Sequence, residues 1–269
     1  MNVSYFVFPA VALYLAAGLG IGLRLFSHPE PTRIPRPLTL ALGFGAAFLH
    51  AIVLYLELHT DGGINLGFFN AAALTAWMIV VLLLVSALSK PVENLAIIIF
   101  PVAAILLLLD LRYPGQHLLD EHANWALRLH VITSILAYAM LTLASVQALL
   151  LAVQDNHLRS HHPGGFVRAL PPLQTMEALL FELIGVGFVL LSVSLLSGFA
   201  YLDDMFAQHV AHKTILSILA WIAFGVLLWG RMRFGWRGRT AIRWTLLGFV
   251  ALMIAYFGSK AILELVLNR

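Results

Sequence analysis

The amino-acid sequence predicts an all-α, polytopic integral membrane helix bundle with about eight transmembrane helices. Of its 269 residues, 61% are hydrophobic and only 11% are charged. A water-soluble fold of this size has too little interior for that much apolar surface, so most of the chain must face lipid. The apolar residues also gather in long runs that short polar loops separate, which is the pattern of a multi-pass membrane protein.

Membrane spans are expected where a run of apolar residues is long enough to cross the bilayer, which takes about 20 residues. Eight segments qualify: residues 3–26, 38–58, 65–88, 95–111, 126–153, 176–202, 214–230 and 241–267. The first has no basic residues before it and no small-residue cleavage site after it, so we expect a retained helix and not a signal peptide. The connecting loops are too short for a soluble module, so we expect one transmembrane domain over residues 1–269.

The distribution of basic residues predicts the orientation of the chain. One set of alternate loops carries most of the lysine and arginine residues, including Arg24, Lys90, Arg159 and the arginines of residues 231–243. Cytoplasmic loops are enriched in these residues, so we expect both termini outside, in the periplasm if the cell is Gram-negative. We interpret residues 231–243 as a topology anchor, with a lipid or protein docking site as the alternative.

The composition excludes several classes of function. The net charge is +3, but the basic residues lie in short loops between apolar spans, which argues against binding to nucleic acid. The chain contains no cysteine, so disulfides, thiolate metal sites and a CxxCH haem attachment motif are excluded. Any metal chemistry must use histidine, carboxylate or methionine side chains. We find no nucleophile and base pair, phosphate loop or metal-hydrolase motif, so we do not expect an enzyme.

Two histidines fall in the outer halves of predicted spans. His50 lies eight residues before the outer end of its span, about 12 Å deep at the helical rise per residue. His130 lies roughly 6 Å below the outer start of the fifth span by the same rise, and Ser134 and Tyr138 repeat its face at intervals of four. An imidazole at such a depth is a candidate functional group.

A neutral imidazole is a good axial ligand for haem iron, and haem also needs apolar walls and cations for its propionates. His50 and His130 are therefore candidate ligands for a non-covalent b-type haem. The residues that we expect near the propionates are Arg112, Arg128 and Lys213, and His212 beside Lys213 is a further candidate for cofactor binding. The alternative is that both candidate ligands are buried polar residues, hydrogen-bonded between helices without a metal. Four further histidines are expected to be solvated in loops: His59, His117, His122 and His209.

The C-terminal half carries an ordered series of motifs. These are Asn124-Trp125, Leu129-His130-Val131, Ala137-Tyr138, residues 184–188, residues 196–198, residues 235–239 and Tyr256-Phe257-Gly258. Their order and spacing resemble the CcsA/CcmC-type core of the cytochrome c assembly superfamily, most strongly over residues 124–260. A cysteine-free bacterial branch of this superfamily also shares Pro171-Pro172-Leu173, Glu177 and residues 234–239.

The resemblance implies a bacterial inner-membrane protein of cytochrome c assembly or haem handling. Members that deliver haem present it on a tryptophan-rich outer segment flanked by two external histidines, and His130 matches the first. The corresponding loop, residues 201–212, contains no tryptophan, no histidine follows Gly258, and Trp229 stands where a further family histidine is expected. Delivery of haem to an apocytochrome is therefore not implied. The HemX-like relatives, which also lack this segment, are implicated in tetrapyrrole synthesis.

We therefore expect a non-enzymatic, haem-binding membrane protein whose partners are membrane lipid, haem and cytochrome c assembly proteins. The alternative is a HemX-like regulator or scaffold, without bound haem, that contacts a haem-synthesis enzyme or assembly partner through residues 155–175 and 231–243. A transporter is less favoured, because the spans lack both a cluster of embedded carboxylates and a convincing inverted repeat.

Overall fold

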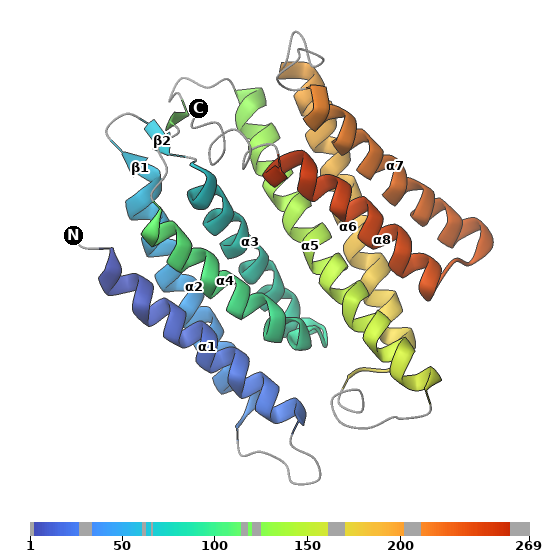
Figure 1. Ribbon diagram of the computed structural model, residues 1–269, viewed down its shortest axis with the longest axis horizontal. Helices are drawn as coiled ribbons and strands as arrows, with labels where there is room; N and C mark the ends of the chain where they lie inside the picture. The colour runs from blue at the N-terminus through green and yellow to red at the C-terminus, as the bar shows by residue number, and fades with distance from the viewer. Residues whose placement is uncertain are drawn as a thin grey trace. The chain divides into compact units, whose positions relative to one another are not determined.

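The computed structural model describes residues 3–26, 34–60, 63–65, 67–113, 118–119, 125–160, 170–201 and 211–258. Within these residues, eight helices are long and apolar enough to cross a membrane, which confirms the predicted all-α multi-pass fold (Figure 1). They are α1 (Ser4–Phe26), α2 (Arg36–Leu58), α3 (Phe68–Ser89), α4 (Ala96–Arg112), α5 (Trp125–Arg159), α6 (Leu173–Tyr201), α7 (Ala211–Phe234) and α8 (Arg239–Met253). A 3-10 turn, Glu93–Leu95, precedes α4, and a π-helical turn, Ile254–Gly258, extends α8.

The chain divides into two compact units, one holding α1 to α4 and the other α5 to α8. In the first unit, α1 and α3 each pack against both α2 and α4, so the four helices close into a bundle. Successive helices in this unit alternate in direction (Figure 1). That residues 1–269 form one domain stays a prediction.

Small residues let the helices of the first unit approach closely. A Cβ atom added at Gly43 on α2 would lie 2.9 Å from Leu84 on α3 and 3.0 Å from Phe100 on α4. Phe100 and Tyr14 are among the largest fully buried side chains, and Trp77 on α3 donates its indole N–H to the carbonyl of Ala47 on α2, 2.8 Å away. The core therefore combines large rings with alanine and glycine at the contacts.

A small antiparallel sheet adjoins the C-terminal end of α2. Its strands are β1 (His59–Thr60), β2 (Gly63–Asn65) and β3 (Leu118–Leu119), in the order β1-β2-β3. The pairing joins His59 to Ile64 and Asn65 to Leu118. Strand pairing supplies hydrogen-bond partners to backbone in a segment that is too polar to span the membrane.

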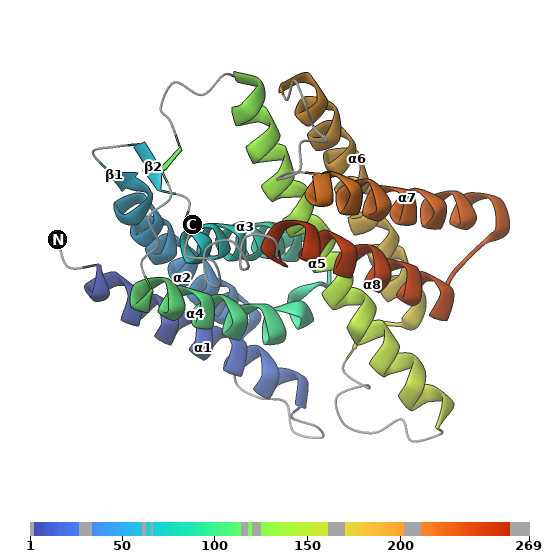
Figure 2. The same ribbon diagram turned by 45° about the horizontal axis from the view of Figure 1, so that its top comes forward.

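In the second unit, α5 packs against α6 and α8, and α7 packs against the same two helices, which again closes a four-helix bundle. Figure 2 shows α7 and α8 of this unit side by side. A Cβ atom added at Gly187 on α6 would lie 2.7 Å from Leu141 on α5, and one at Gly248 on α8 would lie 2.9 Å from Phe224 on α7. Glycine at these contacts allows the helix axes to come close.

Candidate functional site

His130 lies near the start of α5 and is partly buried. Its Nδ1 atom is 2.8 Å from the main-chain carbonyl oxygen of Ser194 on α6. A carbonyl oxygen can only accept, so Nδ1 carries the proton and donates it. In a neutral imidazole this leaves Nε2 unprotonated, with its lone pair available to a metal.

The partner of His130 is itself held in place. The hydroxyl of Ser197 donates to the same Ser194 carbonyl at 2.9 Å, and the Ser194 hydroxyl lies 2.6 Å from that of Ser134, one turn after His130 on α5. Groups that receive the N–H of a ligating histidine set its ring orientation and tautomer. Ser194 therefore holds the ring of His130 between α5 and α6.

Tyr138, two turns beyond His130, belongs to an aromatic cluster with the end of α8. Its ring centroid lies 5.3 Å from that of Phe257, 5.7 Å from that of Phe249 and 6.1 Å from that of Tyr256. The rings around Tyr138 thus form an aromatic surface on α5, two helical turns from the polar contacts of His130. A macrocycle such as haem requires walls of this kind.

His50 on α2 is fully buried, with no exposed side-chain surface. Its Nδ1 atom lies 3.2 Å from the hydroxyl oxygen of Tyr14 on α1, and the two rings meet edge to face at a centroid distance of 5.9 Å. Its Nε2 atom has no hydrogen-bond partner among the described residues. A buried polar atom without a partner is costly and calls for a ligand or another explanation.

Two carboxyl groups lie farther along the same unit. Asp110 on α4 is only 1% exposed, and its carboxyl group approaches that of Glu57, two turns after His50 on α2. Between this pair and His50 lies an apolar layer made by Val7, Ala10, Val53 and Leu107. Neither carboxyl group is among the candidate site residues predicted from the sequence, because their proximity depends on how α2 and α4 pack.

The remaining site candidates lie at helix ends. Arg128 on α5 and His212 at the start of α7 are exposed, and the neighbouring Lys213 is partly buried. The structure describes these three in the second unit, together with His130. Arg112 belongs to the first unit, where its guanidinium lies 5.1 Å from the ring centroid of Tyr113.

His59 and His157 are the remaining histidines that the structure describes. His59 is in β1, and His157 near the end of α5 is exposed, with its Nδ1 atom 2.9 Å from the carbonyl oxygen of Val153 on the same helix. Three named histidines lie outside the described residues: His117, His122 and His209.

His50 and His130 belong to different units, so their joint action on one ligand stays a prediction. In the described part of the chain, no group of three or more histidine or acidic residues is arranged to hold a metal ion. A bare ion needs several protein ligands, whereas haem brings four nitrogens and needs only one or two axial groups.

Comparison with known proteins identifies the relatives of this chain. Residues 38–267 match the model of the family described as "Cytochrome C assembly protein". The "Inner membrane protein YpjD" of Escherichia coli (strain K12) is 33% identical over 223 residues, which cover 82% of this chain and 84% of that protein. The "Cytochrome c biogenesis protein CcsA" of Chlamydomonas reinhardtii is 27% identical over 144 residues, which cover 53% of this chain and 39% of that protein. No solved structure matches the chain significantly.

Proposed function

This chain belongs to the cytochrome c assembly protein family, and from that premise we propose that it is a non-enzymatic inner-membrane protein that binds a b-type haem. The relatives support the context of this role, because one is named an inner membrane protein and others are named cytochrome c biogenesis proteins. The role itself is haem handling or cytochrome c assembly. Both termini lie outside, with the arginine-rich turns in the cytoplasm.

The observation that carries the proposal is the hydrogen bond from Nδ1 of His130 to the Ser194 carbonyl. It selects the tautomer in which Nε2 presents a lone pair, and it orients the ring without using that nitrogen. Because His130 is only partly buried, a planar macrocycle can approach Nε2 without displacing the core of the bundle. His130 would supply a ligand to the iron of the haem.

His50 is proposed as a separate candidate ligand, within the first unit. Its unpartnered Nε2 fits a group that would coordinate it, and its contact with Tyr14 would hold the ring during coordination. The side chain is fully enclosed, so the packing of α1, α2 and α4 around it must open for iron to reach it. Binding at His50 is therefore expected to be slower than binding at His130.

The propionates of the haem require cations near the membrane interface. Arg128 lies two residues before His130, and Lys213 with His212 begins α7 in the same unit. We assign these three residues to the propionates. When bound, haem supplies a redox-active iron, while the protein supplies ligands, apolar walls and charge neutralisation.

The test is the absorption spectrum of the purified protein, with pyridine haemochrome quantitation, after expression with added haem. We expect near-stoichiometric haem in the wild type and loss of the Soret band in His130→Ala. The matched control is His157→Ala, because His157 also holds a backbone carbonyl through Nδ1 but is exposed at the opposite end of α5. An unchanged spectrum in His130→Ala removes His130 from the site.

The second candidate is a HemX-like regulator or scaffold that binds no haem. It is favoured by the fact that the bond to Ser194 already gives His130 a structural partner between α5 and α6. Wild-type protein without haem, even after supplementation, would support this candidate. Its partner, a haem-synthesis enzyme or an assembly protein, should then be retained by His50→Ala and His130→Ala alike.

A further inference from the structure

The turn between α7 and α8 carries a continuous row of aromatic rings. The ring centroids of Trp229 and Phe234 are 5.3 Å apart, those of Phe234 and Trp236 are 6.3 Å apart, and those of Trp236 and Trp244 are 6.2 Å apart. Trp229 and Phe234 are 56% and 61% exposed. Both helices are long and apolar enough to cross a membrane, and the row lies at the ends that the turn joins. Aromatic residues at the ends of spans are typical of the membrane–water interface.

The turn has a defined shape. Gly235 and Gly238 adopt positive φ angles of 67° and 56°, which side chains with a Cβ atom rarely accept. The ring of Trp236 covers Gly230 so closely that an added Cβ atom would clash with it. Arg231 closes the turn by donating to the carbonyl oxygen of Trp236, 3.3 Å away. The turn is therefore preformed and needs little ordering when it binds.

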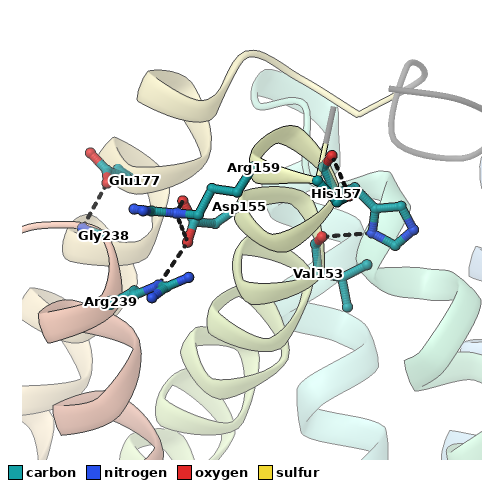
Figure 3. Close-up of polar contacts among 8 residues, drawn as sticks. Val153, Asp155, His157, Arg159, Glu177, Gly238 and Arg239 are labelled. Atoms are coloured by element: carbon teal, nitrogen blue, oxygen red, sulfur yellow. Dashed lines mark hydrogen bonds and ion pairs between the residues drawn. The ribbon is translucent and has the colours of Figure 1, made fainter. Parts of the chain in front are cut away.

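Two acidic residues hold the turn against the neighbouring helices (Figure 3). The backbone N–H of Gly238 donates to Oε1 of Glu177 on α6, 2.8 Å away, and Nε of Arg239 lies 3.2 Å from Oδ2 of Asp155 on α5. Asp155 also pairs with Arg159, 3.0 Å away on its own helix. The carboxylates of Glu177 and Asp155 are thus occupied by other contacts.

Three arginines on and beside the turn have no carboxylate partner among the described residues: Arg233, Arg237 and Arg243. All three are exposed. A guanidinium group matches the oxygens of a phosphate in geometry and charge. The turn therefore combines a fixed backbone, an excess of positive charge and exposed rings at the level of the lipid headgroups.

We propose that the α7–α8 turn is a binding site for anionic phospholipid, with the headgroup phosphate on Arg233, Arg237 and Arg243 and the acyl chains along Trp229 and Phe234. The exposed Met232, which lies between these aromatic residues, adds apolar surface to the site. Lipid is favoured over an acidic protein because the exposed rings belong to a membrane-spanning helix and face lipid in any case. This inference is independent of haem, since none of these residues belongs to the proposed haem site.

The site is tested by native mass spectrometry of the protein released from mixed micelles of phosphatidylglycerol and phosphatidylcholine. We expect wild-type protein to retain phosphatidylglycerol preferentially. An arginine near an anionic lipid surface contributes about fivefold in affinity, so the triple variant Arg233→Gln/Arg237→Gln/Arg243→Gln should lose most of the preference. The control variant Lys90→Gln/Arg112→Gln removes two exposed cations at helix ends of the first unit. It should keep the preference for phosphatidylglycerol.

Three outcomes would overturn the proposal. Equal retention of the two lipids by wild type would show that the turn does not select anionic lipid. Equal loss in the control variant would assign the preference to net charge alone. Complete displacement of phosphatidylglycerol by inorganic phosphate would identify a soluble anion as the ligand. Because the three arginines are exposed, an unchanged melting temperature of the triple variant confirms that it is folded.

Discussion

His130 and Ser194, 64 residues apart in sequence, are joined by a hydrogen bond of 2.8 Å between an imidazole on α5 and a main-chain carbonyl on α6. The acceptor is a backbone atom, so no substitution of Ser194 can remove it directly. Any role of His130 must therefore be probed on the imidazole itself. The bond also ties the orientation of the ring to the packing of α5 against α6.

Removing the imidazole of His130 should create a haem site that free imidazole can fill. In His130→Ala we expect the Soret band to fall to background, because the imidazole that would hold the iron is lost. Millimolar imidazole should restore much of it, since the ligand fits the space that the side chain leaves. Recovery is followed by titration at the Soret maximum. A band that is lost and never recovers in folded protein would indicate a packing role for His130.

Tyr14→Phe should destabilise the first unit, because Nδ1 of buried His50 then loses its partner. An unsatisfied buried polar atom costs about 1–3 kcal/mol. The measurement is the thermal unfolding midpoint in detergent. Tyr5→Phe is the matched control, because Tyr5 lies on the same helix and is exposed. Equal midpoints for the two variants would contradict the contact between Tyr14 and His50.

Substitution by alanine should change the stability of the protein differently at Gly187 and at Gly185, both on α6. Gly187→Ala places a Cβ atom 2.7 Å from buried Leu141, and overpacking of this kind costs about 1–3 kcal/mol. Gly185→Ala meets nothing within 4 Å and should be neutral or stabilising, because alanine favours the helix by about 1 kcal/mol. The difference in unfolding midpoint measures how closely α5 and α6 approach.

Asp110→Asn should leave the first unit as stable as the wild type or more so. The carboxyl groups of Asp110 and Glu57 face one another in a buried place, where a charged carboxylate is costly. The amide of asparagine carries no charge and can keep a hydrogen bond to Glu57. Asp155→Asn is the contrasting variant, because it weakens ion pairs with Arg159 and Arg239 and should cost about 0.5–1 kcal/mol. A larger loss in Asp110→Asn would show that Asp110 acts as a charged group with a cation.

The eight spans could be predicted from composition, because the length of an apolar run is a local property that the bilayer thickness converts directly into a helix. The predicted ends were less accurate. The span predicted for residues 126–153 forms a helix that continues to Arg159, where Asp155 and Arg159 form an i,i+4 ion pair. Hydropathy marks where the apolar run ends, whereas a helix continues as long as its hydrogen bonds and side-chain pairs support it.

The candidate site also has a part that the sequence predicts and a part that depends on the tertiary structure. His50 and His130 were chosen from the sequence alone, because helical rise gives the depth of a residue once the end of its span is known. Their partners Tyr14 and Ser194, and the pairing of Asp110 with Glu57, were decided by the tertiary structure. Depth is set along one helix, but contact depends on how neighbouring helices rotate and approach, which is determined by side-chain packing between residues far apart in the sequence.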